Sequence, residues 1–524
     1  MTPFQEFRLW ARRAPNAERN AALLVAVVVL AAATWVFVPT SSTGSNASLG
    51  QGAPAAPGAA APGVGPAAPV VPGPLSSVGP SLLPGQSAPP AQPGSVDPVT
   101  GQTTGPTPGV PGATNTPRQN GANPCLASDA KGVSAQQIKI AVIRTSIAGP
   151  VANSAFGIST PAEQTKMYQA VIDNLNASGG VACRKLVPTY YNGNPTDQSQ
   201  LRQMCLDIAA SGAFAVLDTG AYAQYPLIDC YAQHKIPYFG AYLIARGLQK
   251  KYYPYLFDFN LLDDVYRDAI FGLRDRGFWT AAKGFKKLGF IYRDCNLDVI
   301  NAMKSQLNQA GVPNSSIVTY NVGCPTALAS PSDLQQAVLK FKQAGVNTVT
   351  TAYFLGDFAG FTNAANQQNF KPRYGIADDA VLALSYGSMA PNAKNLDGAV
   401  AISPTRDGEE RTAGTVPSAG TRRCDAILKK AGLGPTYTLP NIAGNACDNV
   451  WMFAAAVANS GTIRPTTLAA GLQASTVDFS YPQGPTDFSK AGTTTGGQFW
   501  RTVGFQVGCK CWRLLETGFH RSYA

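Results

Sequence analysis

The sequence predicts an α/β protein of two Rossmann-like lobes joined by a hinge, preceded by one transmembrane helix and a disordered linker. Three observations lead to this fold class. Residues 21–38 form an uncharged apolar run, residues 39–124 are rich in Pro, Gly and Ala, and apolar runs then alternate with helical patterns from Gln137 onward. Such alternation is typical of βαβ units, in which helices cover a parallel sheet.

The run 21–38 (AALLVAVVVLAAATWVFV) has the composition of a membrane helix. At about 1.5 Å per residue, it nearly spans a hydrocarbon core of roughly 30 Å. Four arginines precede the run and no basic residue follows it before Arg118. The positive-inside rule then places residues 1–20 in the cytoplasm and the rest of the chain outside. A cleaved signal peptide is the alternative interpretation, and both place the globular part outside the cytoplasm.

The segment 39–124 is built mainly from Pro, Gly, Ala, Ser, Thr and Val, with Asp97 and Arg118 as its charged residues. Such a composition buries too little apolar area to offset the entropy of ordering. We therefore expect a disordered, extended linker that lets a globular domain, residues 125–524, reach away from the membrane.

Strand and helix patterns divide the globular part into two halves, about 125–260 for lobe one and about 285–400 for lobe two. In lobe one, apolar runs predict strands and the intervening segments predict helices; the strands are 138–143, 185–191, 213–218 and 236–242. In lobe two the predicted strands are 287–293, 316–322, 346–354, 372–379 and 397–403. A late helix, 447–461, and a strand-like stretch, 501–508, are expected to pack back across both lobes.

Composition excludes several classes of function. All ten cysteines lie between Cys125 and Cys511, which predicts disulfides in an exported domain. With two histidines and no C-x-x-C pair, we expect neither a metal site nor a cofactor. The net charge is +11, but the basic residues are scattered and indicate no nucleic-acid surface. The sequence has no nucleophile elbow, P-loop, dinucleotide motif or H-E-x-x-H, so it does not predict an enzyme.

The order of several motifs resembles the type I periplasmic-binding fold, and especially the branched-chain amino-acid (Leu/Ile/Val) binding proteins of ABC importers. These motifs include IKIAVIRTSIAGPVA, VIDNLNASGGVACRKL, KLGFIYRD, FKQAGVNTVTTAYF, LDGAVAIS and ACDNVWMFAAAV. The resemblance covers about 137–510. It implies a small-molecule ligand, amino-acid-like, bound between the lobes and delivered to ABC permease and ATPase subunits.

The resemblance also implies ligand-binding positions. In this family, hydroxyls and backbone N–H groups after the third and fourth strands hold the ligand carboxylate, an acidic residue of lobe two meets its ammonium, and an aromatic residue (Tyr353 or Phe354 here) forms a wall. Carried onto this chain, the positions are Thr219, Ala221, Tyr222, Gly240, Ala241, Tyr242, Phe354 and Asp378.

Two residues depart from the family pattern, and several residues have alternative interpretations. The family's carboxylate-binding serine aligns with Ala221, and its lobe-two tyrosine aligns with Leu297. Asp378 and Asp379 could instead cap the following helix, and Tyr222 and Tyr242 could simply pack at strand ends. Asp263 could hold the two lobes together or cap the helix after it, and the cap is the interpretation we favour. A receptor head that senses a ligand or docks a protein or wall component is the alternative function.

The family topology further implies three disulfides, which are Cys125–Cys183, Cys205–Cys230 and Cys295–Cys324. The other four cysteines, Cys424, Cys447, Cys509 and Cys511, are left unassigned, because spacing alone does not give connectivity.

Overall fold

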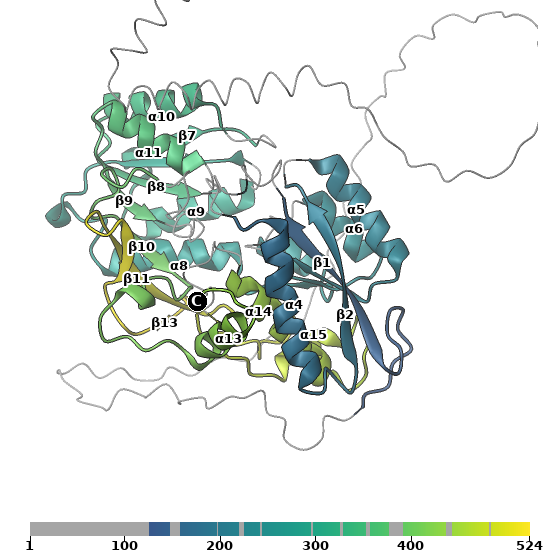
Figure 1. Ribbon diagram of the computed structural model, residues 1–524. Helices are drawn as coiled ribbons and strands as arrows, with labels where there is room; N and C mark the ends of the chain where they lie inside the picture. The colour runs from purple at the N-terminus through teal and green to yellow at the C-terminus, as the bar shows by residue number, and fades with distance from the viewer. Residues whose placement is uncertain are drawn as a thin grey trace, which may run out of the picture. The chain divides into compact units, whose positions relative to one another are not determined.

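The computed structural model describes residues 125–146, 153, 158–195, 197–218, 225–240, 244–294, 297–324, 329–352, 357–376, 391–435, 443–480 and 484–524 (Figure 1). The predicted membrane helix and linker lie outside this part of the chain. Among the helices that are described, none is both long and apolar enough to cross a membrane.

The first lobe is built on a parallel five-stranded sheet in the order β2-β1-β3-β4-β5. Its strands are β1 (Gln137–Thr145), β2 (Lys185–Gly193), β3 (Ala215–Asp218), β4 (Tyr238–Phe239) and β5 (Leu256–Phe257). The connecting helices are α4 (Pro161–Ala177), α5 (Gln198–Ser211), α6 (Tyr225–Gln233) and α7 (Arg246–Lys251). Thr160 and Glu163 form a capping box that begins α4, where the sequence switches from a loop to a helical pattern.

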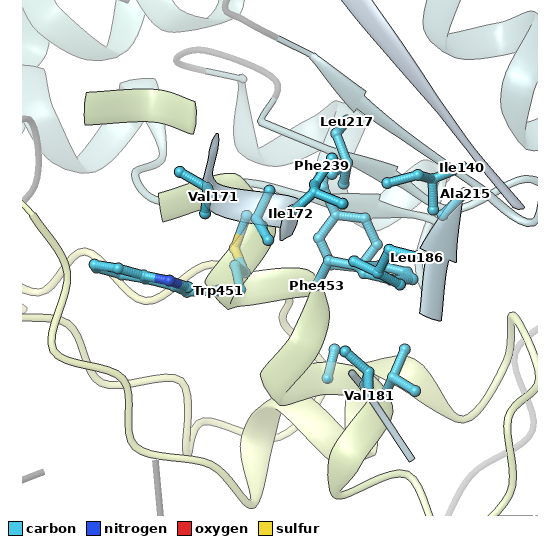
Figure 2. Packing of buried hydrophobic residues seen from close by; sticks show 14 of the residues in the cluster. Ile140, Val171, Ile172, Val181, Leu186, Ala215, Leu217, Phe239, Trp451 and Phe453 are labelled. Carbon is cyan, nitrogen blue, oxygen red and sulfur yellow. The ribbon is translucent and has the colours of Figure 1, made fainter. Parts of the chain in front are cut away.

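Three later helices complete the first lobe, namely α13 (Ala419–Lys430), α14 (Ala443–Ala458) and α15 (Leu468–Gln473). Side chains of all three belong to the core that includes β1, β3 and α4. Figure 2 shows Phe453 of α14 beside Phe239 of β4, and their ring centroids are 5.4 Å apart in an edge-to-face arrangement. The predicted late helix thus belongs to one lobe, because its apolar face is needed to cover the first sheet.

The second lobe contains a larger sheet in the order β12-β11-β10-β9-β8-β6-β7, with β13 paired to β11. Its strands are β6 (Leu288–Tyr292), β7 (Ile317–Asn321), β8 (Thr348–Ala352), β9 (Arg373–Ile376), β10 (Val400–Ser403), β11 (Phe499–Gln506), β12 (Cys511–Leu514) and β13 (His520–Arg521). Its helices are α8 (Leu262–Asp275), α9 (Leu297–Gln309), α10 (Pro331–Gln343) and α11 (Asp357–Gln367), with short 3-10 turns η1 (Ala281–Lys283), η3 (Asn314–Ser316) and η5 (Glu409–Arg411).

Strands β7, β6, β8, β9 and β10 are parallel, whereas β11 and β12 run antiparallel at the edge. The sequence predicts only the parallel part. The antiparallel hairpin was not expected as part of this sheet, since a single strand-like stretch does not reveal which sheet it joins.

The chain passes between the lobes three times, after β5, after β10 and after α15. The first and third passages are bonded to each other, because Gly496 N and Gly497 N both donate to Phe259 O and Asp258 N donates to Thr494 O at 3.2 Å. A Cβ on Gly497 would lie 2.8 Å from the backbone oxygen of Phe259 and 1.7 Å from Asn260 Oδ1, so this close approach favours glycine.

Asp263 does not cap α8, contrary to the favoured interpretation, and instead bonds α8 of the second lobe to α7 of the first, which is the other interpretation. The N-cap of α8 is Leu261, which has no side-chain cap bond. The Asp263 carboxylate instead accepts from Arg246 N at 2.7 Å, at the start of α7. The reason is tertiary: α7 begins without a side-chain cap of its own, and the first turn of α8 lies next to it.

Disulfides join Cys125 to Cys183 and Cys205 to Cys230, which confirms two implied pairs. Cys324 is also disulfide-bonded, and its implied partner Cys295 lies outside the described residues. The previously unassigned cysteines pair as Cys424–Cys447, between α13 and α14, and as Cys509–Cys511 at the tip of the β11–β12 hairpin.

Candidate ligand-binding site

The carboxyl ends of the first-lobe strands meet at one edge of the sheet, where ligands of open α/β folds bind. Asp218 ends β3 and Gly240 follows β4. Thr219 and Ala241 come directly after these two residues, so both predicted binding segments start at this edge.

Of the eight predicted site residues, only Gly240 lies in the described part of the chain. The other seven fall outside the described residues, as does Tyr353; they are Thr219, Ala221, Tyr222, Ala241, Tyr242, Phe354 and Asp378. Their roles therefore remain predictions, and the structure describes the residues from which their segments start.

Gly240 permits a close approach between the end of β4 and helix α14. Its φ is +89°, and a Cβ there would lie 2.5 Å from Asn449 Nδ2 and 2.7 Å from Asp218 O. Only a residue without a side chain fits this space and this left-handed backbone. Gly240 thus fixes the backbone from which residues 241 and 242 continue.

Asn449 of α14 braces the end of β3. Its Nδ2 donates to the carbonyl oxygen of Asp218 and, at 2.8 Å, to Tyr168 Oη. Tyr168 of α4 in turn donates to the same carbonyl oxygen at 3.3 Å. All three residues are almost completely buried. Two side chains from distant segments therefore hold the last peptide before the predicted segment 219–222.

The Asp218 side chain is held from the neighbouring strand. Tyr238 of β4 donates its hydroxyl to Asp218 Oδ2. Burial raises the pKa of Tyr168 and of Tyr238 above the ordinary range of tyrosine, so both hydroxyls keep their protons near neutral pH. Both hydroxyls therefore remain hydrogen-bond donors at the end of β3 near neutral pH.

The end of β1 is braced in a similar way by two buried amides. Gln164 Oε1 accepts from Thr145 N at 2.8 Å, while Gln164 Nε2 donates to Thr145 O at 2.8 Å. Asn153 Nδ2 also donates to Thr145 O, at 2.9 Å, and to Ser159 O, at 3.0 Å. These bonds close the loop between β1 and α4 at the same edge of the sheet.

In the second lobe a buried ion pair holds the corresponding edge. Arg293, after β6, donates from Nε to Asp357 Oδ2 at 3.0 Å and also pairs with it through Nη2. Asp357 Oδ1 accepts from Ala329 N at 2.7 Å. Burial raises the pKa of Asp357, while the Arg293 charge opposes that rise. Asp357 begins α11, directly after the segment that contains Phe354.

Leu297, where the resemblance expects a tyrosine, begins α9 and is 55% exposed. A leucine side chain cannot make the hydroxyl contact that the resemblance implies here.

A shallow depression of about 220 Å³ lies elsewhere, at the amino ends of β3 and β4, and its lining includes Lys131, Phe214 and Lys235. It is at the opposite edge from the predicted site. Within the described ranges, no three His, Cys, Asp or Glu side chains gather closely enough to hold a metal ion.

A family model described as a periplasmic binding protein matches residues 137–505. The chain belongs to this family. The two-lobed periplasmic-binding fold predicted from the sequence is therefore confirmed, and the protein is an extracytoplasmic solute-binding protein rather than an enzyme. A search of curated proteins finds no matching relative.

Solved structures of solute-binding proteins share this fold. One from R. palustris, in complex with 4-hydroxybenzoate, is 15% identical with a TM-score of 0.57, over 74% of this chain and 98% of that one. A branched-chain amino-acid-binding protein from Streptococcus pneumoniae, in complex with isoleucine, is 17% identical with a TM-score of 0.52, over 74% and 100%. A fatty acid ABC transporter substrate-binding protein from Thermomonospora curvata is 14% identical with a TM-score of 0.51, over 76% and 96%. These similarities establish the fold alone, because the identities are only 14% to 17%.

The sequence reasoning missed Asn449 and Tyr168. A signal was present, because Asp448 and Asn449 interrupt the otherwise apolar helix ACDNVWMFAAAV. A buried amide on an apolar helix needs a partner, which here is the end of β3.

Proposed function

We propose that this protein captures a small polar ligand, an amino acid or a related amine or amide, between its two lobes and delivers it to an ABC importer. The observation that carries the proposal is the buried Asn449–Tyr168–Asp218 arrangement together with Gly240. Burying polar groups in order to hold two strand ends in fixed positions is energetically costly. Fixed strand ends in turn preorganise a binding site, which reduces the cost of ordering it when a ligand binds.

In this proposal the segments that follow those strand ends bind the ligand carboxylate. The Thr219 hydroxyl and the backbone N–H groups of Ala221, Tyr222, Ala241 and Tyr242 are the donors. Because Ala221 has no hydroxyl, backbone groups take a larger share of the recognition than in the resembling family. Tyr222 and Tyr242 add flat apolar surface.

The second lobe supplies the counter-charge. Asp378 pairs with the ligand ammonium, and Phe354 forms a wall that favours an apolar or cationic group. Isoleucine in the Streptococcus pneumoniae structure supports an amino-acid ligand. The 4-hydroxybenzoate and fatty-acid proteins support a wider panel of candidates.

The apolar run 21–38 tethers this domain to the membrane, and residues 39–124 give it reach. The partners are then the permease and ATPase subunits of an importer, in the same membrane. The location supports the transport role, since a solute-binding domain at this position meets ligands before they reach the permease.

The test is a thermal-shift screen of the full-length protein in detergent, with its disulfides intact, against amino acids, amides, polyamines, aromatic acids and fatty acids. A ligand at 100 times its dissociation constant stabilises the folded state by about 2.7 kcal/mol, a visible rise in melting temperature. The Asp378→Asn variant should lose the shift for an amine ligand, whereas Asp379→Asn is the matched control and should keep it.

Retention of the shift in Asp378→Asn would contradict the ammonium contact. A shift only with acids that lack an amine would contradict the amino-acid class while leaving solute capture intact. No shift across the panel would favour the alternative, a receptor head that docks a protein or wall component.

A further inference from the structure

Among the four disulfides whose two cysteines are both described, Cys509–Cys511 closes the shortest stretch of chain. Its cysteines are 2 residues apart, whereas the separations are 58 for Cys125–Cys183, 25 for Cys205–Cys230 and 23 for Cys424–Cys447. A disulfide constrains the unfolded chain more strongly as the loop it closes grows longer. The stabilisation expected from Cys509–Cys511 is therefore the smallest of the four, and stability gives little reason for its presence.

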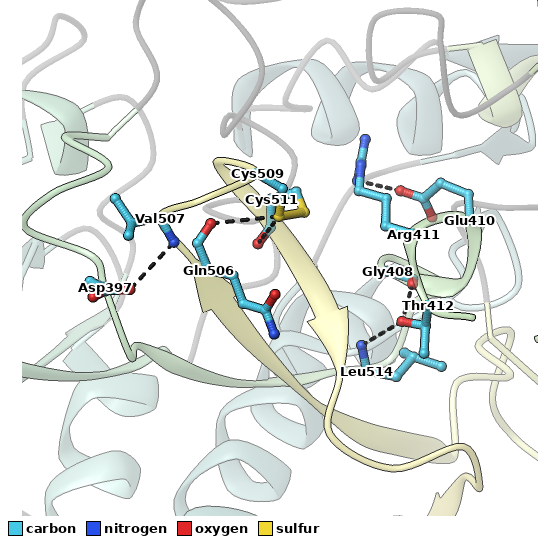
Figure 3. Close-up of a disulfide and its surroundings, with 10 residues drawn as sticks. All are labelled: Asp397, Gly408, Glu410, Arg411, Thr412, Gln506, Val507, Cys509, Cys511 and Leu514. Carbon is cyan, nitrogen blue, oxygen red and sulfur yellow. Dashed lines mark hydrogen bonds and ion pairs between the residues drawn. A yellow bond between two sulfur atoms is a disulfide. The ribbon is translucent and has the colours of Figure 1, made fainter. Parts of the chain in front are cut away.

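The hairpin that carries this disulfide is held by other contacts (Figure 3). Val507 N donates to Asp397 Oδ1 at 3.3 Å, and Leu514 N donates to Thr412 Oγ1 at 3.0 Å. Strands β11 and β12 are paired from Val503↔Leu514 to Gln506↔Cys511, and Lys510 N donates to Val507 O at 3.2 Å across the turn. The hairpin should therefore keep its fold when the disulfide is reduced.

The two sulfur-bearing residues differ in their access to solvent. Cys509 is exposed, whereas Cys511 is 3% exposed and precedes the buried Trp512. Thiol–disulfide exchange requires a thiolate to reach one sulfur while the other leaves. Access therefore favours attack at Cys509, with Cys511 as the leaving thiolate. Lys510, between the two cysteines, adds a positive charge that favours the thiolate form.

We propose that Cys509–Cys511 is a thiol–disulfide exchange site, which accepts two electrons from an extracytoplasmic dithiol while the rest of the fold stays intact. A thiolate of the dithiol bonds to Cys509 Sγ, the Cys509–Cys511 bond breaks, and Cys511 leaves as a thiolate that takes up a proton. The second thiol of the reductant loses its proton and attacks the mixed disulfide, releasing Cys509 as a thiol. The protein disulfide is reduced, and the dithiol is oxidised to a disulfide.

The first test is a dithiothreitol titration of the full-length protein under native conditions, followed by alkylation and peptide mass spectrometry. Cys509 and Cys511 should become half-labelled at a dithiothreitol concentration at least about tenfold below that needed for the other cysteines. The melting temperature should change little at that point. Cys125–Cys183 is the matched control, because both of its residues are exposed but its loop is long. Equal reduction of these two pairs, or unfolding as Cys509–Cys511 opens, would overturn the proposal.

The second test separates the two sulfurs. The variant Cys511→Ser leaves the Cys509 thiol, and Cys509→Ser leaves the Cys511 thiol. The Cys509 thiol should react with an aromatic disulfide probe at least about tenfold faster than the Cys511 thiol, because it is accessible. Equal rates, or a faster Cys511 thiol, would rule out the proposed direction of attack.

Discussion

The two lobes stabilise corresponding sheet edges with different chemistry. In the first lobe the backbone at the ends of β1 and β3 is held by neutral side chains, such as Gln164, Asn449 and Tyr168, while the buried Asp218 carboxyl accepts from the Tyr238 hydroxyl. In the second lobe the loops after β6 and before α11 are held by the Arg293–Asp357 ion pair. A neutral hydrogen bond is less sensitive to loss of one partner than a buried ion pair, which leaves an uncompensated charge. The second edge should therefore depend more strongly on single residues.

Breaking the second-lobe ion pair should have the largest effect. Arg293→Gln leaves the Asp357 carboxylate buried without its cation, and we expect a loss of about 3–5 kcal/mol in the free energy of unfolding. Denaturant unfolding of the full-length protein measures it. Arg464→Gln is the control, because Arg464 pairs with Asp129 at the surface, with side chains 55% and 69% exposed, and little change is expected.

If Arg293→Gln unfolds at the same denaturant concentration as Arg464→Gln, the two ion pairs are equivalent and the contrast between the lobes fails. Recovery of stability in the double variant Arg293→Gln/Asp357→Asn would support the contrast between the lobes. That variant removes both charges, so no uncompensated charge stays buried.

The first-lobe edge should be most sensitive at Gly240. Gly240→Ala places a Cβ against Asn449 and the Asp218 carbonyl, in a left-handed backbone conformation. Overpacking and backbone strain together predict a loss of about 2–4 kcal/mol. Gly247→Ala is the matched control, because a Cβ there meets nothing within 4 Å and Gly247 lies in helix α7, where alanine is favoured by about 0.5–1 kcal/mol. Equal stability of the two variants would show that the end of β4 accommodates a Cβ at Gly240 without a loss of stability.

A smaller effect concerns Asp448, an ionisable residue next to the neutral first-lobe edge. It is completely buried, and Ser480 N donates to its Oδ1 at 2.7 Å. Burial raises the pKa of Asp448 to about 7, while hydrogen bonds from Ser480 and the charges of Arg423 and Arg406 oppose the rise.

Because the folded pKa of Asp448 lies above the unfolded value near 4, the folded state keeps a proton that the unfolded state releases. This contribution favours folding at low pH and is lost as pH rises from about 4 to 7. Asp448→Asn should match the wild type at pH 4 and should be more stable than the wild type at pH 8. Melting temperatures at the two pH values provide the comparison, and a difference that is the same at both would contradict the assignment.

The fold was largely predictable because strands alternating with helices leave a strong local pattern. Strand β8 lies within its predicted range, and helix α10 lies between two predicted strands, since buried runs such as VTTA and the amphipathic pattern of QQAVLKF are visible in the chain itself. The pairing of β11 with β10 was not predictable, because it depends on which edge of the parallel sheet is open. The favoured interpretation of Asp263 as a cap was wrong for a similar reason, as its partner, Arg246 N, is a neighbour only in space.

For the candidate site too, the sequence suggested positions but did not reveal their contacts with distant residues. The family resemblance assigned Gly240 as a ligand-binding position, and that role stays a prediction, whereas its close contact with Asn449, more than 200 residues later, was not foreseen. The assignments of Thr219, Tyr222, Phe354 and Asp378 remain predictions for the binding experiments described above.

The sequence by itself determined the α/β class, the two-lobed organisation and the disulfide-rich, exported character of the globular part. These properties follow from the periodicity and composition of the sequence, which can be recognised within short segments of the chain. Tertiary structure decided which helices cover which sheet, how Cys424, Cys447, Cys509 and Cys511 pair, and which buried groups hold the strand ends. The physical reason is that a buried polar group or an apolar face is satisfied by whatever the fold brings beside it, regardless of distance along the chain.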